Sequence, residues 1–107
     1  MALRLIDAGW RLVADDYSHV WASGDGLYAC APDRIAGRIE ARGLGIVDAA
    51  ARPVARVCLL VDCVQDASER LPEPLFETVA GVRLPRLVLD IRPASAACTL
   101  ALAIDRL

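Results

Sequence analysis

The run from Leu12 to Asp16 constrains the fold of this chain most strongly, because three apolar residues lead directly into two adjacent carboxylates. An apolar start suits a buried strand over residues 11–14, whereas Asp15 and Asp16 cannot be buried without partners. In open α/β sheets, ligands bind at the carboxyl ends of strands, where an acid can hold a cation or move a proton. Two aspartates after a strand also form an ordinary turn or helix cap, so both interpretations stay open.

Length and composition indicate an α/β protein with a single domain. The 107 residues are enough for one core, and 56% of them are hydrophobic, with a mean hydropathy of +0.41. The many Val, Leu and Ile residues predict strands buried on both faces, as in a mixed sheet covered by helices.

Charge and hydropathy exclude several classes of partner. The net charge is −2, and the acids and arginines are spread along the chain, so no basic stripe is available for nucleic acid. No apolar run is long enough to cross a bilayer, and charges interrupt the first fourteen residues, which argues against a secretory signal. We therefore expect a cytoplasmic protein without a membrane or nucleic-acid partner. All twelve basic residues are Arg, so a P-loop lysine cannot come from these residues.

The cysteines and the single histidine give weak signals. The cysteines have no CxxC spacing, and we expect reduced residues of the core rather than a metal site or a disulfide. His19 is either a base or, more commonly for a polar residue near a turn, incidental. The cysteines are Cys30, Cys58, Cys63 and Cys98.

Hydrophobic periodicity and turn residues predict the elements of the remaining chain. The expected elements are a helix at 2–8, the strand at 11–14, a hairpin of 20–22 with 27–30, a short helix or turn between 32 and 37, a long buried strand at 54–64, a pair of 76–80 with 82–84, a strand at 86–91, and a helix rather than a strand within 93–107.

A second informative stretch is IEARGLGIVD, residues 39–48. Gly43 and Gly45 allow positive φ or a close approach of the backbone to a ligand. Glu40 offers a cation ligand, and Arg42 offers a clamp for an anion. A simple turn with a salt bridge explains the same pattern.

Four segments together resemble a known family. In chain order they are ALRLIDAGWRLVADD, APDRIAGRIEARGLGIVD, ERLPEP and GVRLPRLVLDIRP. At these separations they resemble the C-terminal catalytic domain of HPr kinase/phosphorylase, in its short form. The resemblance covers nearly the whole chain, and IEARGLGIVD is its most specific part. It implies a P-loop kinase-like α/β fold with a mixed sheet, and a single domain over residues 1–107.

The resemblance also implies a reaction and roles for particular residues. The reaction is the ATP- and Mg²⁺-dependent phosphorylation of a serine on the phosphocarrier protein HPr, and its reversal by inorganic phosphate. By position, Asp16 resembles the acid/base of this reaction, with Asp15 as a secondary acid that tunes it. Glu40 resembles the Mg²⁺ ligand, and Arg70 resembles a catalytic arginine that offsets charge on the transferred phosphoryl group.

Two further segments match the family by position. Arg42, Gly43 and Gly45 fall in the signature loop, together with Glu40. Asp90, Arg92 and Pro93 fall in the segment that the family uses mainly for phosphorolysis, but the Gly-Arg-Asn ending of longer members is not found after them.

The departure from the family is as informative as the match. Family members carry a Walker A loop before the helix that opens this chain, so we expect an N-terminally incomplete domain without the P-loop strand and with an incomplete nucleotide site. A fragment of this kind is expected to be inactive alone. The alternatives are a non-catalytic module that binds HPr or a metal, and a structural remnant. The family's oligomeric habit further suggests assembly of identical subunits.

Overall fold

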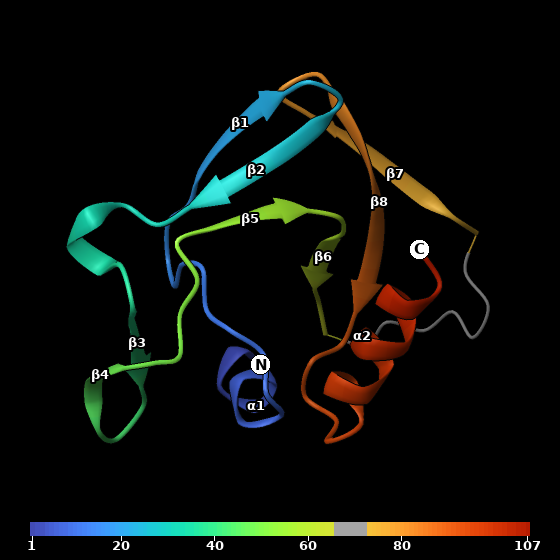
Figure 1. The fold of residues 1–107 in the computed structure, drawn as a ribbon. Coiled ribbons are helices and arrows are strands. Elements are labelled where there is room, and N and C mark those ends of the chain that lie inside the picture. The colour runs from blue at the N-terminus through green and yellow to red at the C-terminus, as the bar shows by residue number, and fades with distance from the viewer. Residues whose placement is uncertain (66–72) are drawn as a thin grey trace. The chain divides into compact units, whose positions relative to one another are not determined.

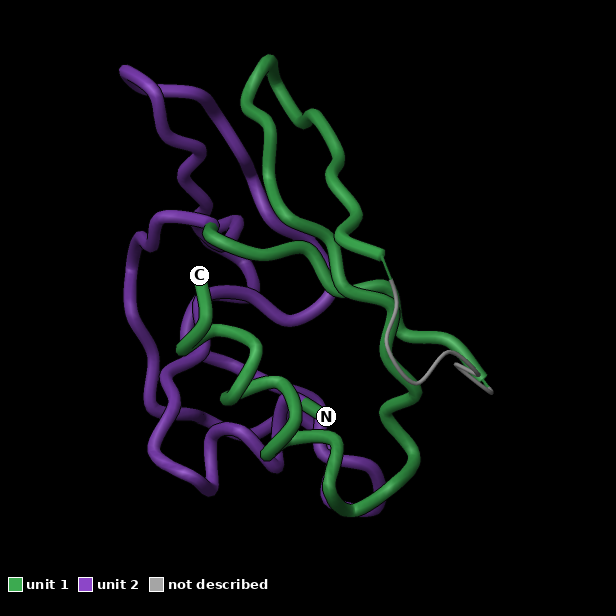
Figure 2. Tube along the Cα trace, turned by 90° about the vertical axis from the view of Figure 1, so that its right-hand side faces the viewer, with its two compact units in different colours: residues 1, 58–107 green, residues 2–57 purple. Residues whose placement is uncertain are grey.

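The computed structural model describes residues 1–65 and 73–107 (Figure 1). The chain divides into two compact units, which are residues 2–57 and residues 58–107 together with Met1 (Figure 2). Each unit contains strands and a helix, and one of the three sheets is mixed, so the predicted α/β class with a mixed sheet is confirmed. The single domain over residues 1–107 stays a prediction.

The unit of residues 2–57 contains two small antiparallel sheets. In the first, β2 lies between β1 and β5; the second is the hairpin of β3 and β4. The predicted hairpin around residues 23–26 and the predicted short helix after Pro32 are both confirmed. The elements are α1 (Ala2–Asp7), β1 (His19–Ser23), β2 (Gly26–Cys30), the 3₁₀ helix η1 (Asp33–Ile35), β3 (Arg38–Ala41), β4 (Gly45–Asp48) and β5 (Val54–Val57).

The unit of residues 58–107 contains one mixed sheet and one helix. In this sheet β8 lies between β6, with which it is parallel, and β7, with which it is antiparallel. The predicted C-terminal helix is confirmed as α2. The elements are β6 (Leu60–Cys63), β7 (Leu75–Val79), β8 (Val82–Leu89) and α2 (Ala96–Asp105).

The predicted strand at 11–14 is wrong. Only Leu12 makes a ladder contact, an isolated parallel bridge to Ala51. The Leu12 N–H donates to the Ala50 carbonyl at 2.8 Å, and the Leu12 carbonyl accepts from the Arg52 N–H at 2.8 Å. Leu12 is buried, so this single anchor still fixes the point from which the two aspartates depart.

The predicted continuous strand at 54–64 is also wrong, because residues 58–59 are not in strand conformation and interrupt it. β5 pairs with β2, whereas β6 pairs with β8, so the two halves of the apolar run serve different sheets. Hydrophobicity alone could not reveal the break, since both halves are equally apolar.

The predicted separate strands at 82–84 and 86–91 are one strand, β8, which continues through Pro85. Proline has no N–H to donate, so it is tolerated where a strand has a free edge. Pro85 lies opposite Phe76 of β7, and the pairing with β6 begins only at Arg86. Pro85 therefore lies in the part of β8 that has one neighbour.

The expectation of strands buried on both faces is wrong for most of the described strands. All five residues of β1 are exposed, and only the last residue of β7 is not. The described residues form three sheets but only two α-helices, of 6 and 10 residues, as helical cover. The buried apolar residues are Leu12, Leu27, Ile39, Ala41, Leu84, Ala96 and Leu100.

The cysteines are free thiols, but their predicted place in the core is wrong. Cys58, Cys63 and Cys98 are exposed, and Cys30 is half-buried. Within the described residues, no helix combines the length and the apolar character needed to cross a bilayer.

Candidate active site

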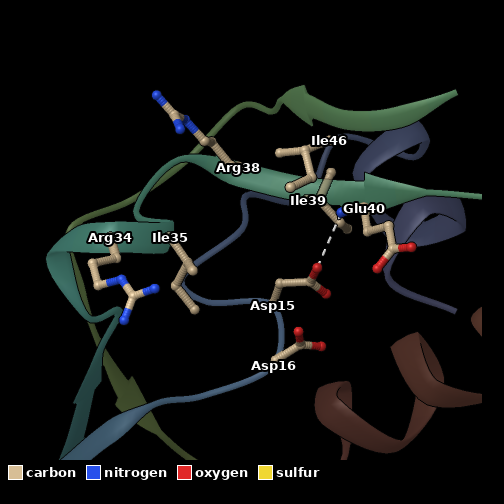
Figure 3. Close-up of a pocket in the computed structure, with 8 residues that line it drawn as sticks. All are labelled: Asp15, Asp16, Arg34, Ile35, Arg38, Ile39, Glu40 and Ile46. Atoms are coloured by element: carbon tan, nitrogen blue, oxygen red, sulfur yellow. Dashed lines mark hydrogen bonds between the residues drawn. The ribbon is translucent and has the colours of Figure 1, made fainter.

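A pocket of about 110 Å³ lies beside β3, within the unit of residues 2–57 (Figure 3). Acidic side chains line one part of it, and arginine and isoleucine side chains line the rest. The lining residues are Asp15, Asp16, Arg34, Ile35, Arg38, Ile39, Glu40 and Ile46.

Alternation along β3 determines which side chains face the pocket opening. Ile39 and Ala41 are buried, whereas Arg38 and Glu40 are exposed on the opposite face of the strand. This period of two is the pattern expected for a strand with one covered face. The charged residues of β3 therefore lie where a ligand can reach them.

A hydrogen bond connects the Asp-Asp segment to β3. The backbone N–H of Glu40 donates to Oδ2 of Asp15 at 3.0 Å. Among the described strands β3 pairs only with β4, so the Asp15 carboxylate accepts a hydrogen bond from an N–H on the other edge of β3. This bond joins residues 25 positions apart and holds the two aspartates beside Glu40.

The carboxylates of Asp15, Asp16 and Glu40 lie on one side of the pocket (Figure 3). Within the described part of the chain, the Asp16 and Glu40 carboxylates have no hydrogen bond or ion pair. The sequence placed these acids 24 residues apart, and the structure brings them to one pocket. Their assigned roles stay predictions.

The donor set suits Mg²⁺ by its chemistry. Mg²⁺ prefers hard oxygen ligands and is usually held by one or two carboxylates, with water and phosphate oxygens completing the octahedron. Residues 1–65 and 73–107 contain no group of three or more His, Cys, Asp or Glu side chains placed to hold a metal ion together. Glu40, the predicted metal ligand, would thus supply one ligand, not a complete protein cage.

Of the signature-loop residues, Glu40 lines this pocket, whereas Arg42, Gly43 and Gly45 lie around the turn of the β3–β4 hairpin and do not. Gly43 and Gly45 have φ of +91° and +97°, so the predicted positive φ is confirmed. The Leu44 N–H donates to the Ala41 carbonyl at 2.9 Å, which closes the turn. Among the described residues Arg42 has no ion pair. The turn is therefore present, but the salt bridge that the simple-turn interpretation included is not found there.

The segment that was assigned to phosphorolysis by resemblance belongs to the other unit, directly after β8. The Asp90 carboxylate accepts from Nε of Arg92 at 3.0 Å, from its Nη2 at 2.8 Å and from its backbone N–H at 3.0 Å. Asp90 is mostly buried, with 18% of its side chain exposed. Arg92 is thus bound by the acid two residues before it, and Pro93 follows.

Arg70, the predicted catalytic arginine, lies outside the described residues. Arg34 and Arg38 were not predicted as site residues, although both line the pocket. A signal for Arg38 was present, since residues i and i+2 of a strand share a face and Arg38 is two positions before Glu40. Nothing comparable in the sequence pointed to Arg34.

Comparisons with known proteins agree with the sequence resemblance. No protein-family model matches the chain. HPr kinase/phosphorylase of Geobacillus thermodenitrificans is 32% identical over 105 residues, which covers 86% of this chain and 34% of that protein. The protein of the same name from Halalkalibacterium halodurans is 30% identical with the same coverage. The chain thus spans about a third of the length of these curated relatives.

A solved structure shows the same arrangement of elements. The structure of the Hpr(Ser) kinase/phosphatase from Coxiella burnetii matches 98% of this chain and 72% of that chain, with a TM-score of 0.81 and 25% sequence identity. Sequence and fold therefore lead to one conclusion: over most of its length the chain is homologous to part of HPr kinase/phosphorylase.

Proposed function

We propose that the 107 residues of this chain contain the acid/base and the metal ligand of an HPr kinase/phosphorylase-type domain. The reaction is the transfer of the ATP γ-phosphoryl group to a serine hydroxyl of an HPr-like phosphocarrier, with phosphorolysis as its reverse. The observation that supports this best is that Asp16 and Glu40, assigned different roles by resemblance, line one pocket.

Asp16 is suited to proton transfer. Its carboxylate is exposed and, in the described part of the chain, has no partner, so a serine hydroxyl can approach it. A general base must come within hydrogen-bonding distance of the proton that it takes. Asp16 would accept the serine proton in the forward direction and return it in the reverse direction.

Glu40 is suited to the metal. A bound Mg²⁺ supplies charge neutralisation for the phosphoryl oxygens. Asp15 Oδ2 already accepts a hydrogen bond from the Glu40 N–H. Asp15 would therefore position Asp16 and Glu40, and would not itself transfer a proton or bind the metal. Arg70 is proposed as the group that offsets the negative charge on the transferred phosphoryl group. We further propose that the protein forms an oligomer and is located in the cytoplasm.

A second candidate is a non-catalytic module that binds Mg²⁺ or HPr. One observation favours it: the 107 residues contain no Lys, so the phosphate contacts of a Walker A lysine cannot come from them. The pocket that Asp16 and Glu40 line is also small compared with typical ligand pockets of roughly 300–1,000 Å³.

Two measurements separate the candidates. Incubation of the chain with ATP, Mg²⁺ and HPr, followed by mass spectrometry of HPr, measures phosphoryl transfer, and calorimetry measures binding of Mg²⁺ and of HPr. Transfer that disappears in Asp16→Asn but persists in Asp25→Asn supports the kinase. Binding without transfer supports the module, and the absence of both binding and transfer refutes both candidates.

A further inference from the structure

The pocket beside β3 has a basic part that the assigned roles leave unused. Arg34 and Arg38 line it together with the three acids. Neither guanidinium has an ion pair or hydrogen bond among the described residues, although Asp48 lies directly opposite Arg38 in the β3–β4 register. Two positive charges therefore border an acidic pocket without being neutralised.

The two arginines differ in direction. Figure 3 shows the Arg34 guanidinium turned to the side on which Asp15 and Asp16 lie, whereas the Arg38 guanidinium extends away from them. Arg34 belongs to η1, whose turn is closed by the Ile35 N–H donating to the Pro32 carbonyl at 3.1 Å. The half-buried Ile35 also lines the pocket, so the turn that carries Arg34 is anchored there.

The pocket opens to solvent, and its volume indicates which part of a ligand can enter it. A volume of about 110 Å³ suits a group of side-chain size, since a cavity of roughly 150 Å³ holds one benzene. The charges limit it further: a guanidinium binds phosphate or carboxylate oxygens through parallel N–H donors. Three acids on the opposite side repel an anion unless a cation accompanies it.

We propose that Arg34 binds the phosphoryl group of a phosphoserine side chain that occupies this pocket. The inference rests on the proposed function, in which seryl-phosphorylated HPr is the product of one direction and the substrate of the other. Arg34 would hold the phosphoryl oxygens from the basic side, while the acids face the seryl oxygen and the cation. Retention of the phosphorylated form then depends on a residue that is not one of the acids.

Calorimetric titration of the chain with phosphoserine-HPr and with unphosphorylated HPr tests this, in the presence and absence of Mg²⁺. The wild-type chain is expected to prefer the phosphorylated form, and more strongly with Mg²⁺. Arg34→Gln is expected to weaken binding of phosphoserine-HPr about tenfold or more, because it removes a charge-assisted bidentate contact. Binding of unphosphorylated HPr should change less than about threefold.

Arg38→Gln is the matched control, since it also removes one positive charge from the pocket lining, but the Arg38 guanidinium extends away from Asp15 and Asp16 (Figure 3). It is expected to change affinity for phosphoserine-HPr less than about threefold. Arg34→Lys, which keeps the charge but not the fork of donors, is expected to recover part of the lost affinity. Titration with inorganic phosphate shows whether the phosphoryl group alone is recognised or needs the rest of the partner.

Three results would overturn the inference: no preference for phosphoserine-HPr in the wild type, an unchanged preference in Arg34→Gln, or an equal loss in Arg38→Gln. If the wild-type chain transfers the phosphoryl group and Arg34→Gln still prefers phosphoserine-HPr, the inference about Arg34 is wrong but the proposed function is not. Arg34-dependent binding without any transfer would instead contradict the catalytic proposal alone.

Discussion

The acids of the pocket differ from two acids of the other unit in whether an arginine binds them. In the unit of residues 58–107, Asp90 is bound by Arg92, and Asp62 is bound by Arg86, whose Nε donates to Oδ2 of Asp62 at 2.6 Å. In the unit of residues 2–57, the acids of the pocket have one described hydrogen bond, from a backbone N–H to Asp15.

This difference separates structural acids from acids available to a ligand. A carboxylate that a guanidinium already binds must lose that partner before it can bind anything else, which lowers its affinity for a cation. The arginines of the acidic pocket lie on another part of its lining and form no described pair with the acids. The comparison therefore predicts large functional effects in the first unit of the chain and small stability effects in the second.

Asp16 and Glu40 provide the largest expected effects. Asp16→Asn is expected to lower the rate of phosphoryl transfer to HPr about 10²–10⁴-fold, as for loss of a general base. Its effect on Mg²⁺ affinity should be under about threefold. Glu40→Gln is expected to lower Mg²⁺ affinity about tenfold or more, and excess Mg²⁺ should restore transfer in this variant but not in Asp16→Asn.

Asp25→Asn is the control for both, because the Asp25 side chain is fully exposed in the turn between β1 and β2 and lies outside the pocket. Equal responses of Asp16→Asn and Glu40→Gln to added Mg²⁺ would show that the two acids have one shared role, contrary to the division proposed here.

The Arg86–Asp62 pair is expected to have the next largest effect, on stability alone. Asp62→Asn is expected to lower the free energy of unfolding by about 1 kcal/mol, since both side chains are more than a third exposed and solvent screens the pair. A double-mutant cycle with Arg86→Gln isolates the coupling between the two groups by denaturant titration. Loss of HPr or Mg²⁺ binding in Asp62→Asn would contradict a purely structural role.

Asp15 tests whether an acid of the pocket acts through the backbone. Asp15→Ala removes the acceptor of the Glu40 N–H and is expected to cost about 0.5–1 kcal/mol of stability, whereas Asp15→Asn keeps an acceptor oxygen and should cost less. Hydrogen exchange at the Glu40 amide should accelerate in Asp15→Ala. Unchanged exchange at this amide would show that the bond does not hold β3 to the Asp-Asp segment.

Local patterns were enough to predict much of the fold. The glycine-rich turn between β1 and β2 and the C-terminal helix follow from residues close together in the chain. The break between β5 and β6 could not be predicted, because it depends on which distant strands each half pairs with. The predicted strand at 11–14 failed for a similar reason, since its only ladder contact is with Ala51, far along the chain.

The site was predictable by residue type but not by arrangement. Asp16 and Glu40 were chosen from separate motifs, and the hydrogen bond from the Glu40 N–H to Asp15 that brings them together has no sequence signature. The short helix that carries Arg34 was predictable, but its position beside Asp15 and Asp16, which lie about twenty residues earlier, depends on tertiary packing.

Arg92 provides the smallest expected effect and the closest test of the contrast between units. Arg92→Gln is expected to lower the free energy of unfolding by about 0.5 kcal/mol or less, because 55% of the Arg92 side chain is exposed to screening solvent and the less exposed Asp90 carboxylate keeps its hydrogen bond from the backbone N–H of residue 92. High salt should reduce even this difference, whereas Arg11→Gln, a change at an exposed arginine that has no ion pair among the described residues, should be neutral in any salt. Denaturant titrations at low and high salt measure both. Arg92→Gln could instead lower the affinity for phosphoserine-HPr as much as Arg34→Gln does. That result would show that an arginine already paired with Asp90 also contributes to ligand binding. Pairing within the chain would then not distinguish structural charges from functional ones.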